Sequence, residues 1–123
     1  MTRCGILLLV LICGEAAAPA AAHHSFAIFD RTKLLTLQGV ARKVEYGNPH
    51  IFLFVEVPTA DGHTKLWSIE CGGVNYMNSL GWKVNTIKPG DAVTVIVNPL
   101  RDGQPGGTLQ KMTLSNGAVI DLR

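Results

Sequence analysis

Three histidines and a free α-amine are the groups of this chain best suited to hold a metal ion. His23 and His24 follow a run of small residues, Ala16–Ala22, that is typical of the cleavage region of a secretory signal. Cleavage after Ala22 would leave His23 first, with its amine and ring nitrogen able to chelate one ion. Cleavage after Ala21 would leave His24 third, an arrangement that wraps copper(II) or nickel(II) with the amine, two backbone amides and the ring. The α-amine loses its proton near about pH 8, so either arrangement can bind near neutral pH.

His50 is the natural third ligand for such an ion. It follows the turn dipeptide Asn48-Pro49 and opens an apolar segment, so a rigid backbone would fix its ring. We therefore expect copper to be bound by the new N-terminus and His23, with His24 and His50 as supporting ligands. Two alternatives remain open: the paired histidines belong to a solvated tail without a ligand, and His50 is a surface histidine whose ring bonds a nearby carbonyl.

The other residue types used in catalysis or metal binding lack suitable spacing. No Cys-x-x-Cys or His-Glu-x-x-His pattern occurs, so the common zinc signatures are not supported. No serine lies in a Gly-x-Ser-x-Gly elbow, and the carboxylates are scattered rather than paired for acid/base work. His63 follows a hairpin signal, Asp61-Gly62, and is expected in solvent. We therefore expect a protein that is not an enzyme.

A protein- or glycan-interaction surface is the rival to the metal site. The segment from residue 64 to residue 71 alternates, which gives it an apolar face with Trp67, Ile69 and Cys71 and a polar face with Ser68 and Glu70. In this hypothesis Asn48, Trp67 and Glu70 meet a partner in the cell envelope and the histidines are incidental. Trp67 shares its face with Ile69, however, so core packing is the better interpretation of that side chain.

The first 22 residues have the order of regions found in a secretory signal. Basic Arg3 leads into the apolar run Ile6–Ile12, and the small residues follow. The apolar run is much shorter than the roughly 20 residues that span a bilayer. We expect export to the bacterial periplasm or medium, removal of residues 1–22, no transmembrane segment after processing, and a single domain over residues 23–123.

Charge and cysteine content limit the partners and the covalent structure. The formal net charge is +2, and removal of the signal leaves it unchanged because Arg3 and Glu15 leave together. A value so close to zero gives no electrostatic reason to expect a nucleic acid or an anionic membrane as a partner. Only Cys71 lies beyond the signal, so an internal disulfide cannot form.

The elements that would position these residues are mainly strands. Apolar residues at every second position, separated by turn residues, predict five strands over 33–46, 50–57, 64–71, 92–98 and 108–114. Gly39 inside the first strand indicates a bulge or bend, and the second strand, apolar on both faces, is expected to be covered on both sides. Helical spacing over 74–82 predicts one short helix that Asn75 caps and Gly81 ends. Asn116-Gly117 signals a further hairpin before a short apolar tail.

Three strands, a short helix and two strands is the element order of the five-stranded oligonucleotide/oligosaccharide-binding (OB) barrel. A long, bent first strand suits this architecture, because that strand serves both halves of the barrel. We therefore predict an all-β domain with one short helix and an OB-like barrel. A small open β-sandwich is the alternative topology.

Several motifs span nearly all of the chain beyond the signal. They are Ala22–Phe26, Phe29-Asp30, Asn48–His50, Trp67–Glu70, Gly81-Trp82, Lys88–Asp91 and Asn98–Gly103 with Gly106-Gly107. In this order they resemble a family of small exported bacterial proteins classified as a domain of unknown function. The resemblance implies export, one β-rich domain and no established activity. The family pattern has an arginine two residues before the Gly-Trp pair, where this chain has Ser79, so no role of that arginine is carried over.

Overall fold

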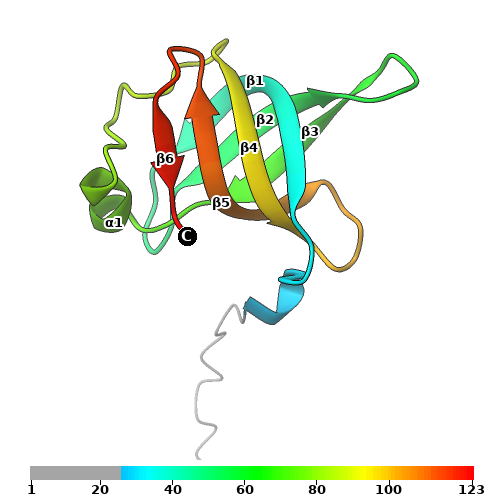
Figure 1. Cartoon of the computed structure of the whole chain (residues 1–123), viewed down its shortest axis with the longest axis horizontal. Coiled ribbons are helices and arrows are strands. Elements are labelled where there is room, and N and C mark those ends of the chain that lie inside the picture. Colours follow the sequence, from blue (N-terminus) through cyan, green and yellow to red (C-terminus); the bar gives the residue numbers. More distant parts are fainter. Residues whose placement is uncertain (1–25) are drawn as a thin grey trace, which may run out of the picture.

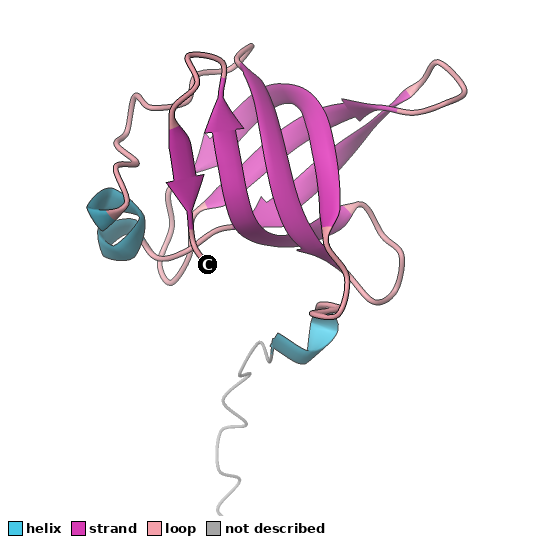
Figure 2. Ribbon diagram, in the orientation of Figure 1, coloured by secondary structure: helices cyan, strands magenta, loops and turns pink. Residues whose placement is uncertain are grey.

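Five strands close into a barrel in the computed structural model, which describes residues 26–123 (Figure 1, Figure 2). The elements are η1 (Phe26–Ile28), β1 (Leu35–Glu45), β2 (Phe52–Pro58), β3 (Thr64–Glu70), α1 (Val74–Ser79), β4 (Ala92–Pro99), β5 (Gly106–Leu114) and β6 (Val119–Asp121). The strand order is β3-β2-β1-β4-β5-β6, and a parallel pairing of β3 with β5 closes the ring. The predicted all-β class with one short helix and a five-stranded OB-like barrel is confirmed. The open sandwich is wrong, because its two edges are paired with each other.

β1 joins the two halves of the barrel. Its first half pairs with β4 and its second half pairs with β2, and Val40 takes part in both pairings. The strand is curved (Figure 1), and at Gly39 a Cβ atom would lie only 2.3 Å from the carbonyl oxygen of Glu56 on β2. The prediction of a bulge or bend is thus correct for β1 as a curved strand with an irregular register. The register shift that accompanies it lies farther along, between Ala41 and Lys43.

The core fills the inside of the barrel with alternate residues of its strands. The largest fully buried side chains are Trp82, Ile51, Leu53, Ile69, Met77, Leu109, Met112, Val55, Val95 and Val97. On β2 the inward residues are buried, whereas Phe52 and Phe54 on its outer face are half-buried. The expectation that this strand is covered on both sides therefore holds fully for its inner face and in part for its outer face. As expected, Ile69 and Cys71 are buried and Trp67 packs against the same core.

The short helix α1 attaches to the barrel through Met77 and Trp82, both fully buried. α1 is shorter than predicted, and Gly73 rather than Asn75 lies at its N-cap, without a side-chain capping bond. Beyond its last turn, Gly81 takes a positive φ of 98°. The Trp82 amide then donates to the Met77 carbonyl and the Gly81 amide to that of Asn78, which is the Schellman pattern. This turn carries Trp82 back under the helix.

β6 extends the sheet beyond the five barrel strands. The hairpin signalled by Asn116-Gly117 is present, and the short apolar tail after it forms a paired strand. One edge of β5 is shared, because β3 pairs with residues 106–108 and β6 with residues 111–113. Within residues 26–123, no helix has the length and apolar character needed to cross a bilayer.

Candidate functional site

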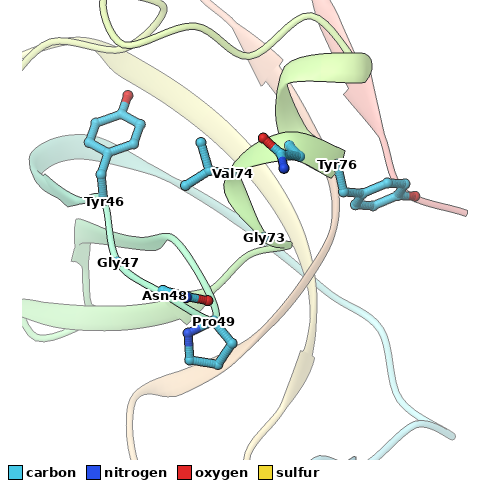
Figure 3. Close-up of a pocket in the computed structure, with 8 residues that line it drawn as sticks. Tyr46, Gly47, Asn48, Pro49, Gly73, Val74 and Tyr76 are labelled. Atoms are coloured by element: carbon cyan, nitrogen blue, oxygen red, sulfur yellow. The ribbon is translucent and has the colours of Figure 1, made fainter.

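Two neighbouring cavities lie where the β1–β2 connection meets the start of α1. The first, the tyrosine cavity, has a volume of about 440 Å³ and is lined by residues 46–49 and 73–76 (Figure 3). The second, the histidine cavity, has a volume of about 360 Å³, and Arg31, His50 and Glu70 line it together with residues 108–110 of β5. Gly73 and Tyr76 line both cavities, so the two are neighbours separated by these residues.

Glycines and a proline bring the two walls of this site together. The peptide bond between Asn48 and Pro49 is cis. The Ile51 amide then donates to the Gly72 carbonyl at 3.1 Å, so the chain before α1 runs alongside the connection. A Cβ atom on Gly73 would lie 3.1 Å from the Pro49 carbonyl oxygen. A side chain at Gly73 would therefore fit only if the Pro49 carbonyl shifted slightly.

His50 and Glu70 form a side-chain pair in the histidine cavity. Nδ1 of His50 lies 3.1 Å from Oε1 of Glu70, with 32% of the histidine side chain and 15% of the glutamate side chain exposed. Phe52 of β2 lies opposite Glu70 of β3, which puts His50 diagonal to Glu70 on the same face. The structure thus places a carboxylate, that of Glu70, beside the ring of His50.

Arg31 reaches the histidine cavity from the N-terminal segment. The Asp30 amide donates to the Pro99 carbonyl at 2.7 Å, which fixes the chain just before Arg31. The Asp30 carboxylate in turn accepts from the Thr32 hydroxyl at 2.6 Å and lies 3.2 Å from the Lys33 ammonium. These bonds, first that of Thr32 and then that of Lys33, lower the pKa of Asp30 to about 2. The ionised carboxylate thus holds the turn that presents Arg31.

Cys71 borders the same cavity but is not a reactive group. Its side chain is buried, and its Sγ lies 3.7 Å from the Ile69 carbonyl oxygen. Burial raises the pKa of the Cys71 thiol far above its usual range, so the thiol stays protonated. Glu70 points to the other face of β3, as the alternation predicts, so the two side chains cannot share one ion.

The remaining predicted site residues are distributed as follows. Asn48 lies in the tyrosine cavity beside the cavity of His50 and Glu70, whereas Trp67 packs against the core and lines neither cavity. The structure thus brings Asn48, His50 and Glu70 to one place and separates Trp67 from them. His63 is exposed in the β2–β3 hairpin, as predicted.

The predicted metal ligands at the N-terminus cannot be compared with His50 in the structure. His23, His24 and the predicted signal, residues 1–22, lie outside the described residues. Within residues 26–123, no three His, Cys, Asp or Glu side chains gather in a way that would hold a metal ion by themselves. A metal site at His50 would therefore need ligands from elsewhere.

Two tyrosines of the site were not singled out from the sequence. Tyr46 accepts a hydrogen bond from Nε1 of Trp82 at 3.0 Å and donates to the Val84 carbonyl at 3.0 Å, and 40% of the residue remains exposed. Tyr76 on α1 is 49% exposed. The sequence does indicate that Tyr76 is exposed, because the apolar stripe of the helix consists of Val74, Met77 and Leu80 and does not include Tyr76.

Comparison with known proteins identifies the family and supports the fold. A family model described as a family of unknown function, DUF6152, matches residues 10–111, which is most of the chain. The chain belongs to this family. The match confirms that the motifs in the sequence are those of a family of unknown function. Among curated proteins, none matches it in sequence.

A solved structure similar to this DUF6152 chain is the mitochondrial single-stranded DNA binding protein Rim1 of S. cerevisiae. The TM-score is 0.53 at 14% sequence identity, and the match covers 68% of this chain and 93% of that chain. At so low an identity the likeness concerns the fold alone. It agrees with the OB-like closure of β1 to β5.

Proposed function

We propose that this DUF6152 protein is an exported, non-catalytic binding protein of the bacterial envelope, and that its ligand is a transition-metal ion, copper first. The observation that carries the proposal is the pair of His50 and Glu70, with Nδ1 of the ring 3.1 Å from the carboxylate. Histidines that ligate metals almost always donate their other ring N–H to such a partner, which fixes the ring and makes it a better ligand. Glu70 has this role here and Nε2 of His50 is the donor to the ion.

The other ligands come from the processed N-terminus. His24 lies seven residues before Arg31, which lines the histidine cavity. Seven residues span at most about 24 Å, so the chain is long enough for His23 and His24 to fold back toward His50. An α-amine and imidazole nitrogens form the tetragonal nitrogen environment that copper(II) prefers.

A binding role fits the chemistry of the site better than a catalytic one. The only thiol beyond the signal, that of Cys71, is buried and protonated. The Cys71 thiol is buried on the face of the strand opposite to Glu70, the partner of His50, so the thiol and the imidazole do not share one face. The groups in the histidine cavity are therefore suited to hold a ligand.

Native mass spectrometry of the exported protein, with and without copper(II), tests this function. We expect a mature chain that begins at Ala22 or His23 and takes up one copper ion. The His23→Ala, His24→Ala double variant should lose the ion, and His50→Ala should bind it at least about tenfold more weakly. His63→Ala is the matched control, because His63 lies in the exposed β2–β3 hairpin. Equal copper uptake by the wild type and the double variant contradicts the proposal.

A further inference from the structure

The tyrosine cavity has no part in the proposed metal site and has a different chemistry. Among the residues that line it there is no Asp, Glu, Lys, Arg or His. Its volume of about 440 Å³ lies within the range of small-molecule sites, roughly 300–1,000 Å³. An uncharged lining does not compensate the desolvation of a charged ligand, so the ligand that fits is neutral.

Tyr46 forms a fixed aromatic wall of this cavity. Its hydroxyl accepts from Trp82 and donates to the backbone carbonyl of Val84, with that of Lys83 at 3.3 Å, so the ring cannot turn freely. The buried Trp82 supports it from behind. In Figure 3 the ring of Tyr46 lies at the left, Val74 near the middle and Asn48 and Pro49 at the bottom. A ring held in this way binds a flat ligand face at a small cost in conformational entropy.

Two carboxamides supply the polar contacts. The side chains of Asn48 and Asn75 line the cavity and make no hydrogen bond within residues 26–123. Each offers two N–H donors and a carbonyl acceptor, which match groups that both donate and accept, such as sugar hydroxyls and an acetamide. Val74 and Pro49 provide an apolar surface beside them.

We propose that the tyrosine cavity binds an N-acetylhexosamine unit of a neutral glycan. The C–H face of the sugar ring packs on Tyr46, the acetamide bonds Asn48 and Asn75, and its methyl group lies on Val74. A charged sugar is disfavoured by the lack of a charged partner in the lining. This inference is independent of the metal site, because none of its contacts involves a histidine.

Calorimetric titration of the full mature protein with N,N′,N″-triacetylchitotriose tests the inference. We expect saturable binding and a change in Trp82 fluorescence, since Trp82 bonds the hydroxyl of Tyr46. Asn48→Ala and Asn75→Ala should each weaken binding about tenfold, the effect of one lost hydrogen bond. Both residues are exposed, so these variants are expected to fold. Leu66→Ala, at an exposed position on β3, is the control and should bind as the wild type does.

A second pair of variants separates stacking from folding. Tyr46→Phe keeps the ring but loses the hydroxyl bonds that fix it, so it should bind more weakly than the wild type, whereas Tyr46→Ala should abolish binding. Equal affinity for cellotriose, which lacks the acetamide, overturns the assignment of an N-acetylated sugar. Tighter binding of an uncharged peptide than of the trisaccharide overturns the glycan itself. Absence of trisaccharide binding in a protein that still takes up copper overturns this inference and leaves the metal proposal standing.

Discussion

At the scale of single residues, the chemistry of the histidine cavity depends on which groups share a face of the β2–β3 ribbon. His50 and Glu70 are far apart in the sequence but diagonal neighbours in the sheet. Cys71, one position beyond Glu70, is buried on the opposite face. The alternation of side chains along β3 thus places the Glu70 carboxylate beside His50 and the Cys71 thiol on the opposite face.

Glu70→Gln tests the role of the carboxylate in metal binding. The variant keeps a hydrogen-bond acceptor for Nδ1 but removes the negative charge that makes His50 a better ligand. We expect copper affinity to fall about tenfold, as for other changes to the partner of a metal-bound histidine. The measurement is competition with a chelator at neutral pH. Glu56→Gln is the control, because Glu56 pairs with Arg42 away from the cavity, and an equal loss in both variants would rule out a specific role for Glu70.

Asp30→Asn tests how the turn around Arg31 is held. The pKa of Asp30 is lowered from 3.8 to about 2 by Thr32 and Lys33, so its ionised form stabilises the folded state. This contribution is fully present above pH 3.8 and is lost as the pH falls through about 2. The free energy of unfolding of Asp30→Asn should therefore lie below that of the wild type at pH 5 and approach it at pH 2. Denaturant titrations across this range measure it, and a difference that does not change with pH argues against the ionised carboxylate.

At the scale of elements, β1 is the strand on which closure of the barrel depends. Its pairing changes from β4 to β2 at Val40. At the neighbouring Gly39, β1 lies very close to the backbone of β2. Because any side chain at this position meets the carbonyl of Glu56, no larger residue fits there unless β2 moves.

Gly39→Ala should therefore destabilise the barrel. Its Cβ would lie 2.3 Å from the Glu56 oxygen and 2.7 Å from a methyl group of Val55. Overpacking of this kind costs about 3 kcal/mol of unfolding free energy. Urea denaturation measures the loss, and Gln38→Ala, at the exposed neighbouring position, should change it by less than about 0.5 kcal/mol. If the two variants lost similar amounts of unfolding free energy, β2 would have to move aside at little cost.

The element order of the barrel could be predicted from the sequence, but the pair at its candidate site could not. Period-two segments and a helical segment follow from side-chain spacing alone, and the irregularity of β1 is indicated by Gly39 within it. Pairing of His50 with Glu70 depends on register, which the turn sets. A two-residue turn at Asp61-Gly62 would place Glu70 opposite Leu53 and His50 on the other face.

The structure instead has a three-residue loop. The Thr59 amide donates to the His63 carbonyl, and Gly62 takes a φ of 84°. This one-residue difference brings His50 and Glu70 onto one face. Trp67 and Glu70 lie on opposite faces of β3, as the alternation in the sequence predicts, and Trp67 packs against the core. The end of the helix was predicted too late because the Schellman turn starts before Gly81.

β6 lies outside the closed ring yet contributes to the core. Ile120 is 3% exposed and pairs with Met112, whereas its neighbour Val119 is 50% exposed. Ile120→Ala should lower the free energy of unfolding by about 3 kcal/mol, the cost of removing a buried Ile side chain. Val119→Ala, in the same strand, should change it by less than about 0.5 kcal/mol. Urea denaturation of both variants compares them, and equal effects would place β6 outside the cooperative unit.

At the scale of the whole molecule, the two candidate cavities lie at the ends and connections of the strands of the closed barrel. The β1–β2 connection, the start of α1 and Arg31 surround the two cavities. Each wall comes from a different part of the chain, but all are anchored to the same closed sheet. Such an arrangement fixes side chains on rigid supports, which suits binding without a large change of shape.

The same fold in a single-stranded DNA binding protein raises the question of whether this chain also binds DNA. Single-strand binders combine a basic groove with exposed aromatic platforms. Here the net charge is +2, and five of the cations form ion pairs with carboxylates: Lys33, Arg42, Lys43, Lys111 and Arg123. Trp67, the tryptophan on β3, packs against the core. The electrostatic contribution that dominates DNA affinity is therefore small.

We expect the mature protein to bind oligothymidylate more weakly than about 10⁻⁴ M at physiological salt, the weak end of non-specific binding. Fluorescence anisotropy with a labelled oligonucleotide measures this, and a series at lower salt reports the number of phosphate contacts. Because the affinity of true DNA binders falls steeply with salt, a shallow slope would agree with binding through scattered cations only. Tight binding with a steep slope, lost on substitution of Arg31 or Lys111, would instead mean that the cations on this barrel act together and that its ligand is a polyanion.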